Sequence, residues 1–333
     1  MRNGKLLKLK YLFDNRDLAE MILKNWNYDT EETTDLLKYF RISSNAVYPF
    51  KRDGAVNFLR FTPQEEGSEE GILAEIDYIN FLKGKGYPVV EVIPSKVGKS
   101  LEIVDTPWGR YFAVAFKGVP GKQISRLELT EDMIYGWGKA LGQLHGHSVE
   151  FKTADDIRVD WRQKLIWMEE ELKECPQEAS ARKEVELLGN FLSKLPVTKE
   201  NFGLIHYDFE ADNLFYEEAT GRYYPIDFDD SVYHWFVMDI VQAIDSVTED
   251  MPSERHETAK EIFLRGYRSV KIIDDEILKH SEAFRRYANL YGYIRCLRSI
   301  GESWSNEPDW MVSLRQHFKK SMERESQNFG KIL

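Results

Sequence analysis

The stretch GLIHYDFEADNLFYEEATGRYYPIDFDD, residues 203–230, carries the most specific pattern of this 333-residue chain. Two short segments rich in aromatic and β-branched residues lie on either side of the turn-forming sequence Glu-Ala-Thr-Gly, and this pattern predicts a β-hairpin. We expect Glu217 to lie opposite Arg222. In that antiparallel register, Asn213 and Asp227 emerge together at the open end of the hairpin.

The side chains at this open end suit metal binding and phosphoryl transfer. Asp208 precedes Asn213 by five residues on the incoming loop, so three oxygen-bearing side chains are expected in one place. Magnesium takes one or two protein carboxylates together with substrate phosphates, which favours Asn213 and Asp227 as its ligands. The remaining carboxylate, Asp208, can accept or orient a hydroxyl proton. Taken singly, each of these residues is also typical of a turn.

The spacing of these residues matches a known arrangement. His206, Asp208 and Asn213 form the pattern H-x-D-x-x-x-x-N, and an apolar hairpin ending in I-D-F follows, as in the catalytic and metal loops of protein-kinase-like enzymes. Together with LHGHS at 144–148 and the downstream Asp239, this block resembles the aminoglycoside phosphotransferase / choline kinase-like family.

The resemblance implies a fold and an activity. The fold class is α+β, a two-lobed protein-kinase-like fold with an antiparallel β-sheet N-lobe that contains one inserted helix and a mainly helical C-lobe with an embedded catalytic hairpin. The activity is ATP- and magnesium-dependent phosphorylation of a small-molecule hydroxyl by direct in-line transfer. Asp208 is then the catalytic base or hydroxyl-orienting carboxylate, and Asn213 and Asp227 are the magnesium ligands. His206 is expected to brace the catalytic loop, with a packed core histidine as the alternative, and Asp239 to hold the backbone of that loop.

The rest of the chain fits a division near residue 120, with an N-lobe at 1–119 and a C-lobe at 120–333. One or two amphipathic helices are expected before residue 38, and they either belong to the N-lobe or cap it. Helices dominate from Thr130 onward, including one long charged helix over roughly 160–195. The segments expected to form the N-lobe strands and its inserted helix are KYFRIS (38–43), AVYPFK (46–51), AVNFLRFT (55–62), the helix EEGILAEIDYINFLKGKGYP (69–88), VVEVIPS (89–95) and YFAVAFK (111–117).

Two residues of the N-lobe are expected to serve the nucleotide phosphates. Kinase-like folds need a cation on the third strand and a glutamate on the following helix that holds it. Arg60 lies on the third expected strand, and Glu75 shares the apolar face of the helix, where an unpaired charge is costly. We expect these two residues to form an ion pair, and a glutamate exposed at the edge of the helix is the alternative.

The segments expected to contact the nucleotide depart from the protein-kinase pattern. The loop between the first two strands contains no glycine, and its residues are Ser43, Ser44 and Asn45. Small polar side chains and backbone N–H groups can line phosphates, but the same three residues also suit an ordinary turn. The resemblance places backbone hydrogen bonds to adenine in the connector that begins with Phe116 and Gly118.

Two alternatives remain open for the acceptor. Acidic and aromatic side chains near the catalytic loop suit an amine-bearing alcohol, through charge pairing and cation–π contact. Tyr291, Arg286 and Arg295 suit instead a carboxylate-bearing acceptor such as an amino acid alcohol. The predicted substrate residues for the amine are Glu210, Asp212, Asp229, Tyr233 and Trp235, with Asp230, His234 and Trp304 as further candidates.

Composition limits the partners of the chain. Lys and Arg number 45 and Asp and Glu number 56, so the formal net charge is −11, which argues against nucleic acid or an anionic membrane surface as the main partner. No apolar run approaches membrane-spanning length, and no signal peptide pattern is found. Cys175 and Cys296 lie far apart and outside any metal-binding motif, so a reducing cytoplasm is expected. The oligomeric state has no signature in the sequence.

A second class of function stays open. The glycine-free phosphate loop also fits a catalytically silent kinase-like module that binds nucleotide or a partner protein. Against this alternative, a silent module has no physical need for Asp208, Asn213 and Asp227 together. Phosphorylation of protein is disfavoured, because no D-F-G and no A-P-E-like segment follows Asp227 to form a peptide-binding activation segment.

Overall fold

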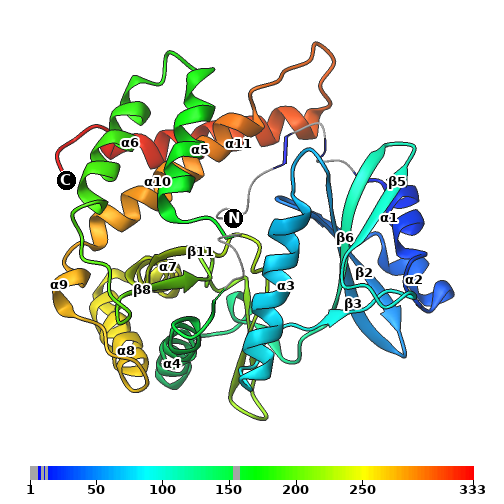
Figure 1. Cartoon of the computed structure of the whole chain (residues 1–333), viewed down its shortest axis with the longest axis horizontal. Coiled ribbons are helices and arrows are strands. Elements are labelled where there is room, and N and C mark those ends of the chain that lie inside the picture. Colours follow the sequence, from blue (N-terminus) through cyan, green and yellow to red (C-terminus); the bar gives the residue numbers. More distant parts are fainter. Residues whose placement is uncertain (1–6, 9–10, 12–13, 153–157) are drawn as a thin grey trace.

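An antiparallel sheet forms the first lobe of the computed structural model, which describes residues 7, 8, 11, 14–152 and 158–333 (Figure 1). The order of the strands is β1-β2-β3-β6-β4, and β5 pairs with the same edge of β6 as β4 does. Asp53 and Gly54 have positive φ values of 53° and 73° and form the tight turn between β2 and β3 that the sequence Arg-Asp-Gly predicted. The strands are β1 (Arg41–Ile42), β2 (Ala46–Arg52), β3 (Ala55–Pro63), β4 (Val92–Ile93), β5 (Glu102–Thr106) and β6 (Gly109–Lys117).

Most of the predicted strands are confirmed, and the exceptions have simple causes. The segments 46–51, 55–62 and 111–117 form β2, β3 and β6, whereas only Arg41–Ile42 of the predicted segment 38–43 forms a strand, β1. The segment 89–95 forms only the two-residue strand β4, because Pro94 has no N–H with which to continue the ladder. The strand β5 was not predicted, since it lies at an edge with only one of its five residues buried and carries little hydrophobic pattern.

Helices cover both faces of this sheet (Figure 1). Along β6, Phe112, Val114 and Phe116 join the core that includes α3 (Glu69–Gly84), while the alternating residues Tyr111 and Ala113 face α1 (Arg16–Leu23). The helix α2 (Thr30–Leu36) lies on the same side as α1. The predicted amphipathic N-terminal helices therefore exist and pack against the sheet of the first lobe.

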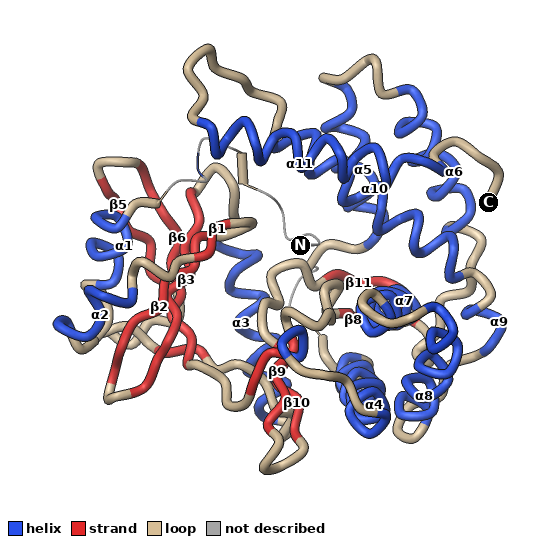
Figure 2. Tube along the Cα trace, turned by 180° about the vertical axis from the view of Figure 1, so that it is seen from behind, coloured by secondary structure: helices blue, strands red, loops and turns tan. Residues whose placement is uncertain are grey.

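The second lobe is mainly helical, so the predicted α+β two-lobed fold is confirmed (Figures 1 and 2). The predicted single helix over 160–195 is wrong: Cys175 and Pro176 separate two helices, because proline removes a backbone donor and restricts the residue before it.

Within the described ranges, no helix is long and apolar enough to cross a membrane. The helices of this lobe are α4 (Glu131–Ser148), α5 (Trp161–Lys173), α6 (Ala179–Leu192), α7 (Val237–Thr248), α8 (His256–Arg268), α9 (Asp275–Leu278), α10 (Ser281–Ser299) and α11 (Asp309–Glu325), with short 3-10 helices at Ile124–Arg126, Ser253–Arg255 and Ser326–Asn328.

Two small sheets lie within this helical lobe. In the first, β10 (Arg222–Pro225), β9 (Leu214–Glu217) and β7 (Lys122–Gln123) lie side by side, and in the second β11 (Val232–Trp235) pairs with β8 (Phe202–Ile205). The connector between the lobes passes so close to β9 that a Cβ at Gly121 would lie 2.2 Å from the carbonyl oxygen of Tyr216. Gly121 also has a φ of 88°, so glycine is required at this position.

Candidate active site

The predicted register of the hairpin β9–β10 is confirmed. Arg222 lies opposite Glu217, and the backbone N–H of Ile226 donates to the carbonyl oxygen of Asn213 over 2.9 Å. This register brings Asn213 beside Asp227, whose φ of 66° lies in the left-handed region that residues other than glycine rarely adopt. Such a backbone conformation persists only where the surrounding structure enforces it.

Asp208 joins this pair. The side-chain amide of Asn213 donates to Oδ2 of Asp208 over 2.7 Å, and to the backbone carbonyl of the same residue over 3.2 Å. Asp208, Asn213 and Asp227, the three residues predicted for the chemistry, therefore meet at the open end of the hairpin. They come from two loops that precede and follow β9 and β10.

Asp239 holds the backbone of the catalytic loop, as predicted. Its two oxygens accept hydrogen bonds from the N–H groups of His206 and Tyr207, over 2.9 and 2.7 Å. One of these oxygens also contacts Nε2 of His145 over 3.0 Å, and Nδ1 of His145 contacts the hydroxyl of Tyr267 over 2.9 Å. The carboxylate at position 239 is fully buried, so these partners are what make its burial tolerable.

His206 braces the catalytic loop from inside the core. Its Nε2 lies 3.0 Å from the carbonyl oxygen of Ile226, and its Nδ1 accepts the N–H of Asp208 over 3.2 Å. Burial lowers the pKa of His206 to about 4. The imidazole is therefore neutral at physiological pH and links the catalytic loop to the residue before Asp227, which is the bracing role that was predicted.

Burial and like charges dominate the electrostatics of the two carboxylates. Burial, with added repulsion from Glu210 and Asp212, raises the pKa of Asp208 well above its ordinary value. Burial and the neighbouring Asp229 raise the pKa of Asp227, although Arg60 acts in the opposite direction. A divalent cation beside Asp227 would relieve this repulsion.

The donors available for a metal are few. Among the described residues, no three His, Cys, Asp or Glu side chains lie close enough to form a metal site by themselves. Asn213 and Asp227 supply one amide and one carboxylate, which is a ligand set that leaves positions for phosphates and water. Magnesium prefers this kind of site.

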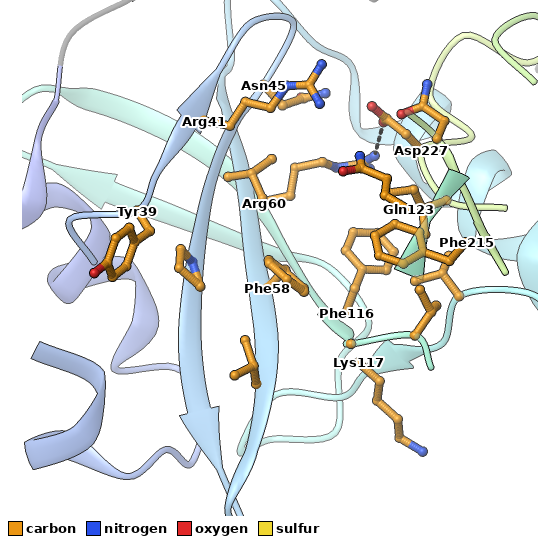
Figure 3. Close-up of a pocket in the computed structure, with 18 of the residues that line it drawn as sticks. Tyr39, Arg41, Asn45, Phe58, Arg60, Phe116, Lys117, Gln123, Phe215 and Asp227 are labelled. Atoms are coloured by element: carbon orange, nitrogen blue, oxygen red, sulfur yellow. Dashed lines mark ion pairs between the residues drawn. The ribbon is translucent and has the colours of Figure 1, made fainter. Parts of the chain in front are cut away.

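The predicted ion pair between Arg60 and Glu75 is confirmed. The guanidinium of Arg60, on β3, meets both carboxylate oxygens of Glu75, on α3, at 2.8 and 2.5 Å. Both side chains are buried, with 8% and 2% of their surface exposed. Nη1 of Arg60 also lies 3.6 Å from Oδ1 of Asp227 (Figure 3). The pair therefore connects the first lobe to the loop of the second lobe that contains Asp227.

A cleft of about 760 Å³ lies between the lobes beside these residues (Figure 3). One part of its wall is apolar, with Phe58, Phe116 and Phe215 among its side chains, and another part is polar, with Arg60 and Asp227. All the residues predicted for nucleotide binding line it except Glu75, which contacts Arg60. The lining includes Ser43, Ser44, Asn45, Gly118 and Asn213, and also Tyr39, Arg41, Val47, Pro49, Val56, Val90, Lys117, Val119, Gly121, Lys122, Gln123, Arg126 and Ile226.

Phe58 and Phe215 were not among the predicted site residues. Phe58 lies two positions before Arg60, so strand periodicity places both on one face of β3, and this signal was present in the sequence. Phe215, on β9, follows Asn213 by two positions. The structure shows why position 118 needs glycine: a Cβ there would lie 2.4 Å from the carbonyl oxygen of Val56.

A second cavity, of about 230 Å³, lies between the first turn of α3 and the helices α5 and α10. It shares Ser44, Asn45 and Arg60 with the larger cleft. Its remaining walls combine charged and aromatic side chains, namely Glu66, Glu75, Arg158, Gln163, Lys164, Trp167, Asp229, Asp230 and Tyr291, together with Thr62, Gly67, Ser68, Gly71, Ile72, Val159 and Ser231.

Asp230, in this second cavity, is fully engaged with the protein. Its oxygens contact Nζ of Lys164 at 3.1 Å, the hydroxyl of Tyr291 at 2.9 Å and Nη1 of Arg295 at 3.4 Å. Burial would raise the pKa of Asp230, but the two cations and the tyrosine outweigh it and hold this pKa at about 2. Asp230 therefore holds the side chains of Lys164 and Tyr291 in place in the cavity wall.

Several substrate residues were predicted wrongly. Trp235 is completely buried, and its ring is tilted by 48° against that of Trp161, with 5.3 Å between the ring centroids. It donates its indole N–H to the carbonyl of Pro196, so it faces the core. His234 is buried beside it. Arg286, a candidate for binding a carboxylate-bearing acceptor, pairs with Glu184 at 2.5 Å and lines neither cavity.

The other substrate candidates have mixed positions. Tyr233 pairs with Leu204 in a strand and lines neither cavity. Trp304 also lines neither. Glu210 is buried near Asp208, and Asp212 forms an ion pair of 3.3 Å with Arg41. Asp229, Asp230 and Tyr291 do line the second cavity. Successive side chains of a strand point to opposite sides of the sheet. Consecutive aromatic residues such as those of β11 therefore cannot all face one pocket, although the sequence alone does not show which of them do.

Comparison with known proteins agrees with this geometry. Residues 39–273 match the model of the phosphotransferase enzyme family. Amicoumacin kinase of Bacillus subtilis (strain 168) is 24% identical over 297 residues, which cover 85% of this chain and 86% of that protein. The solved structure of amicoumacin kinase hAmiN in complex with AMP-PNP, Ca2+ and Ami has a TM-score of 0.76, 22% identity and 95% coverage of each chain. A microcompartment-associated aminopropanol kinase has a TM-score of 0.64, 20% identity and coverage of 94% of this chain and 97% of that one. The chain therefore belongs to the phosphotransferase enzyme family, and it is a small-molecule kinase.

Proposed function

We propose that this enzyme transfers the γ-phosphoryl group of ATP, with magnesium as the metal, to the hydroxyl of an amine-bearing small molecule. The observation that carries the proposal is the meeting of Asp208, Asn213 and Asp227 next to the buried Arg60–Glu75 pair, beside a cleft that Arg60, Asn213 and Asp227 line. The proposal assigns residues 1–119 to the N-lobe and 120–333 to the C-lobe, and places the enzyme in the cytoplasm, where its free cysteines would stay reduced.

The nucleotide would occupy the larger cleft. Its base would lie among the rings of Phe58, Phe116 and Phe215, and its phosphates would lie toward Arg60 and the phosphate loop, by which we mean residues 43–45. The similar fold of a kinase solved with AMP-PNP supports this placement. The ion pair with Glu75 keeps the guanidinium of Arg60 in one position, so the cation is preorganised for a phosphate.

Asn213 and Asp227 would hold the metal. The repulsion among buried carboxylates around Asp227 supports a cation at this position. Bound there, magnesium would neutralise charge on the phosphate oxygens during transfer. The distance of 3.6 Å between Asp227 and Arg60 lets the two residues serve neighbouring phosphates.

Asp208 would orient the acceptor hydroxyl and take its proton. The amide of Asn213, which donates to Oδ2 of Asp208 over 2.7 Å, leaves the other carboxylate oxygen for the hydroxyl. The hydroxyl oxygen then forms a bond to phosphorus as the bond to the leaving ADP oxygen breaks, and no covalent enzyme intermediate is needed. Positioning and charge stabilisation supply most of the catalysis in such transfers.

The acceptor would enter beside the catalytic loop, near the second cavity. The ring of Tyr207, the residue before Asp208, lies 5.3 Å from the ring of Tyr291, which lines that cavity. Glu210, Asp212, Asp227 and Asp230 make the surroundings of Asp208 negative, and this charge favours an amine-bearing acceptor over an anionic one. A structural neighbour named as an aminopropanol kinase supports the same class.

An acceptor screen tests this proposal. ATP consumption in the presence of magnesium would be measured with amino alcohols, amino sugars, amino acid alcohols and neutral sugars. We expect turnover with an amine-bearing alcohol, and loss of that turnover when magnesium is removed. Turnover confined to carboxylate-bearing or neutral alcohols would contradict the assigned acceptor class, and turnover without a divalent metal would contradict the metal site.

A further inference from the structure

We propose that Asn45 and Asp229 form a contact between the lobes that positions the phosphate loop over the terminal phosphates of the nucleotide. The inference rests on the proposed function, because it assumes that nucleotide phosphates occupy the larger cleft. It assigns Asn45 a positioning role, where the sequence suggested direct contact with phosphate.

The contact joins two functional loops that are far apart in the sequence. Nδ2 of Asn45, in the phosphate loop, donates to Oδ2 of Asp229 over 2.8 Å, and 184 positions separate the two residues. Asp229 lies two residues after Asp227. A single hydrogen bond to a carboxylate therefore fixes the phosphate loop relative to the loop that contains Asp227 and Asp229.

A second contact connects the same part of the first lobe to the catalytic loop. Arg41, which precedes the phosphate loop, lies 3.3 Å from Oδ2 of Asp212. Both side chains of this pair are substantially exposed, so it contributes little by itself. Asn45 is half-buried, and it lines both cavities. The Asn45–Asp229 contact therefore lies at the boundary between the two cavities, where it can fix the position of the phosphate loop.

The acceptor of this hydrogen bond is held rigidly on its own side. Nη1 of Arg158 donates to the carbonyl oxygens of Asp229 and Ser231, over 3.1 and 3.3 Å, and Nη2 donates to that of Phe228 over 3.3 Å. The guanidinium of Arg158 is buried, and it holds the backbone of residues 228–231 in one conformation. Asp229 is therefore a fixed point against which the phosphate loop is placed.

The composition of the phosphate loop fits this role. A glycine-rich loop can settle onto phosphates because its backbone is flexible, whereas this loop contains no glycine and is tied at several points. The N–H of Ser43 donates to the carbonyl of Asn45 over 3.1 Å, and the N–H of Leu7 donates to the carbonyl of Ser43 over 2.9 Å. With the amide of Asn45 bound to Asp229, Ser43 and Ser44 remain to face the phosphates.

Nucleotide analogues of different length test the inference. In Asn45→Ala we expect affinity for AMP-PNP with magnesium to fall by about tenfold, the effect of losing one hydrogen bond to a charged group. Adenosine should bind as it does to the unchanged enzyme, because it does not reach the phosphate loop. Isothermal titration calorimetry measures both affinities, and Asn57→Ala is the matched control, since the amide of Asn57 bonds only within the first lobe, to Ala55.

An exchange of the two side chains gives a second, independent test. Asn45→Asp should weaken AMP-PNP binding more than Asn45→Ala, because two carboxylates would then face each other. Combining Asn45→Asp with Asp229→Asn restores an amide–carboxylate hydrogen bond with reversed direction, so the double variant should bind AMP-PNP better than Asn45→Asp alone.

The outcomes separate the two proposals. If the unchanged enzyme does not bind AMP-PNP with magnesium, the proposed function is wrong. If it binds AMP-PNP but Asn45→Ala binds equally well, or loses adenosine binding to the same extent, the positioning role is wrong. Failure of the exchanged pair to improve on Asn45→Asp would also overturn it.

Discussion

The buried ion pair between Arg60 and Glu75 allows stability and nucleotide binding to be separated. Replacing Glu75 by leucine leaves the guanidinium of Arg60 buried, with Asp227 at 3.6 Å as its nearest remaining carboxylate. Removing one partner of a buried pair costs about 3–5 kcal/mol. For a chain of 333 residues this corresponds to a fall of about 4–7 °C in Tm.

Replacing both partners has a different expected result. The double variant with Arg60→Met and Glu75→Leu removes both charges and keeps a similar volume, so most of the lost stability should return, because both desolvation penalties disappear. The same variant has no cation on β3 to meet a phosphate. We therefore expect a Tm close to that of the unchanged enzyme, together with loss of most of the affinity for AMP-PNP.

Thermal unfolding followed by circular dichroism and titration calorimetry with AMP-PNP measure the two quantities on the same samples. Glu75→Gln is the matched control, since it keeps one hydrogen bond to Arg60. A double variant as unstable as Glu75→Leu would refute the argument from desolvation. A double variant that binds AMP-PNP like the unchanged enzyme would refute the role of Arg60.

Three further predictions concern the supporting structure. Asp239→Asn keeps a single acceptor oxygen for the two N–H groups of His206 and Tyr207, so kcat should fall by at least about tenfold while nucleotide affinity changes little; an unchanged kcat would contradict the supporting role of this residue. Burial lowers the pKa of His234 to about 3. Below the ordinary histidine pKa of about 6.5, the unfolded chain therefore binds a proton at position 234 that the folded chain does not. The free energy of unfolding should keep its full value above pH 6.5 and fall by about 2 kcal/mol at pH 5 because of this residue. Urea unfolding at pH 7 and pH 5 measures the loss, and His234→Phe should reduce it; an equal loss in that variant would contradict the assignment. Gly121→Ala places a Cβ against the carbonyl of Tyr216 and forces a φ of 88° on alanine, so Tm should fall, whereas Gly84→Ala, where a Cβ meets nothing within 4 Å, should leave it unchanged or higher.

The parts of the site that could be predicted are those held by local spacing. Asp208, Asn213 and Asp227 lie within one hairpin and its loops, so the register set by Glu217 and Arg222 places them without knowledge of the rest of the chain. The pairing of Arg60 with Glu75 followed from the resemblance to kinase-like folds, supported by the cost of an unpaired glutamate on an apolar helix face.

The parts that could not be predicted depend on contacts between distant segments. Trp235 and Asp229 are only six residues apart, yet the former packs in the core and the latter lines a cavity. The ion pair between Arg286 and Glu184 joins α10 to α6, and nothing near Arg286 in the sequence shows that its partner lies 102 positions away. The same is true of the contact between Asn45 and Asp229.

The most direct test of the central claim compares Asp208→Asn with the unchanged enzyme on the best acceptor from the screen. If Asp208 orients the hydroxyl and takes its proton, kcat should fall by about 10²–10⁴, while Tm and the affinity for AMP-PNP with magnesium stay close to their original values. Turnover by Asp208→Asn at an undiminished rate would contradict the assignment of the catalytic residue.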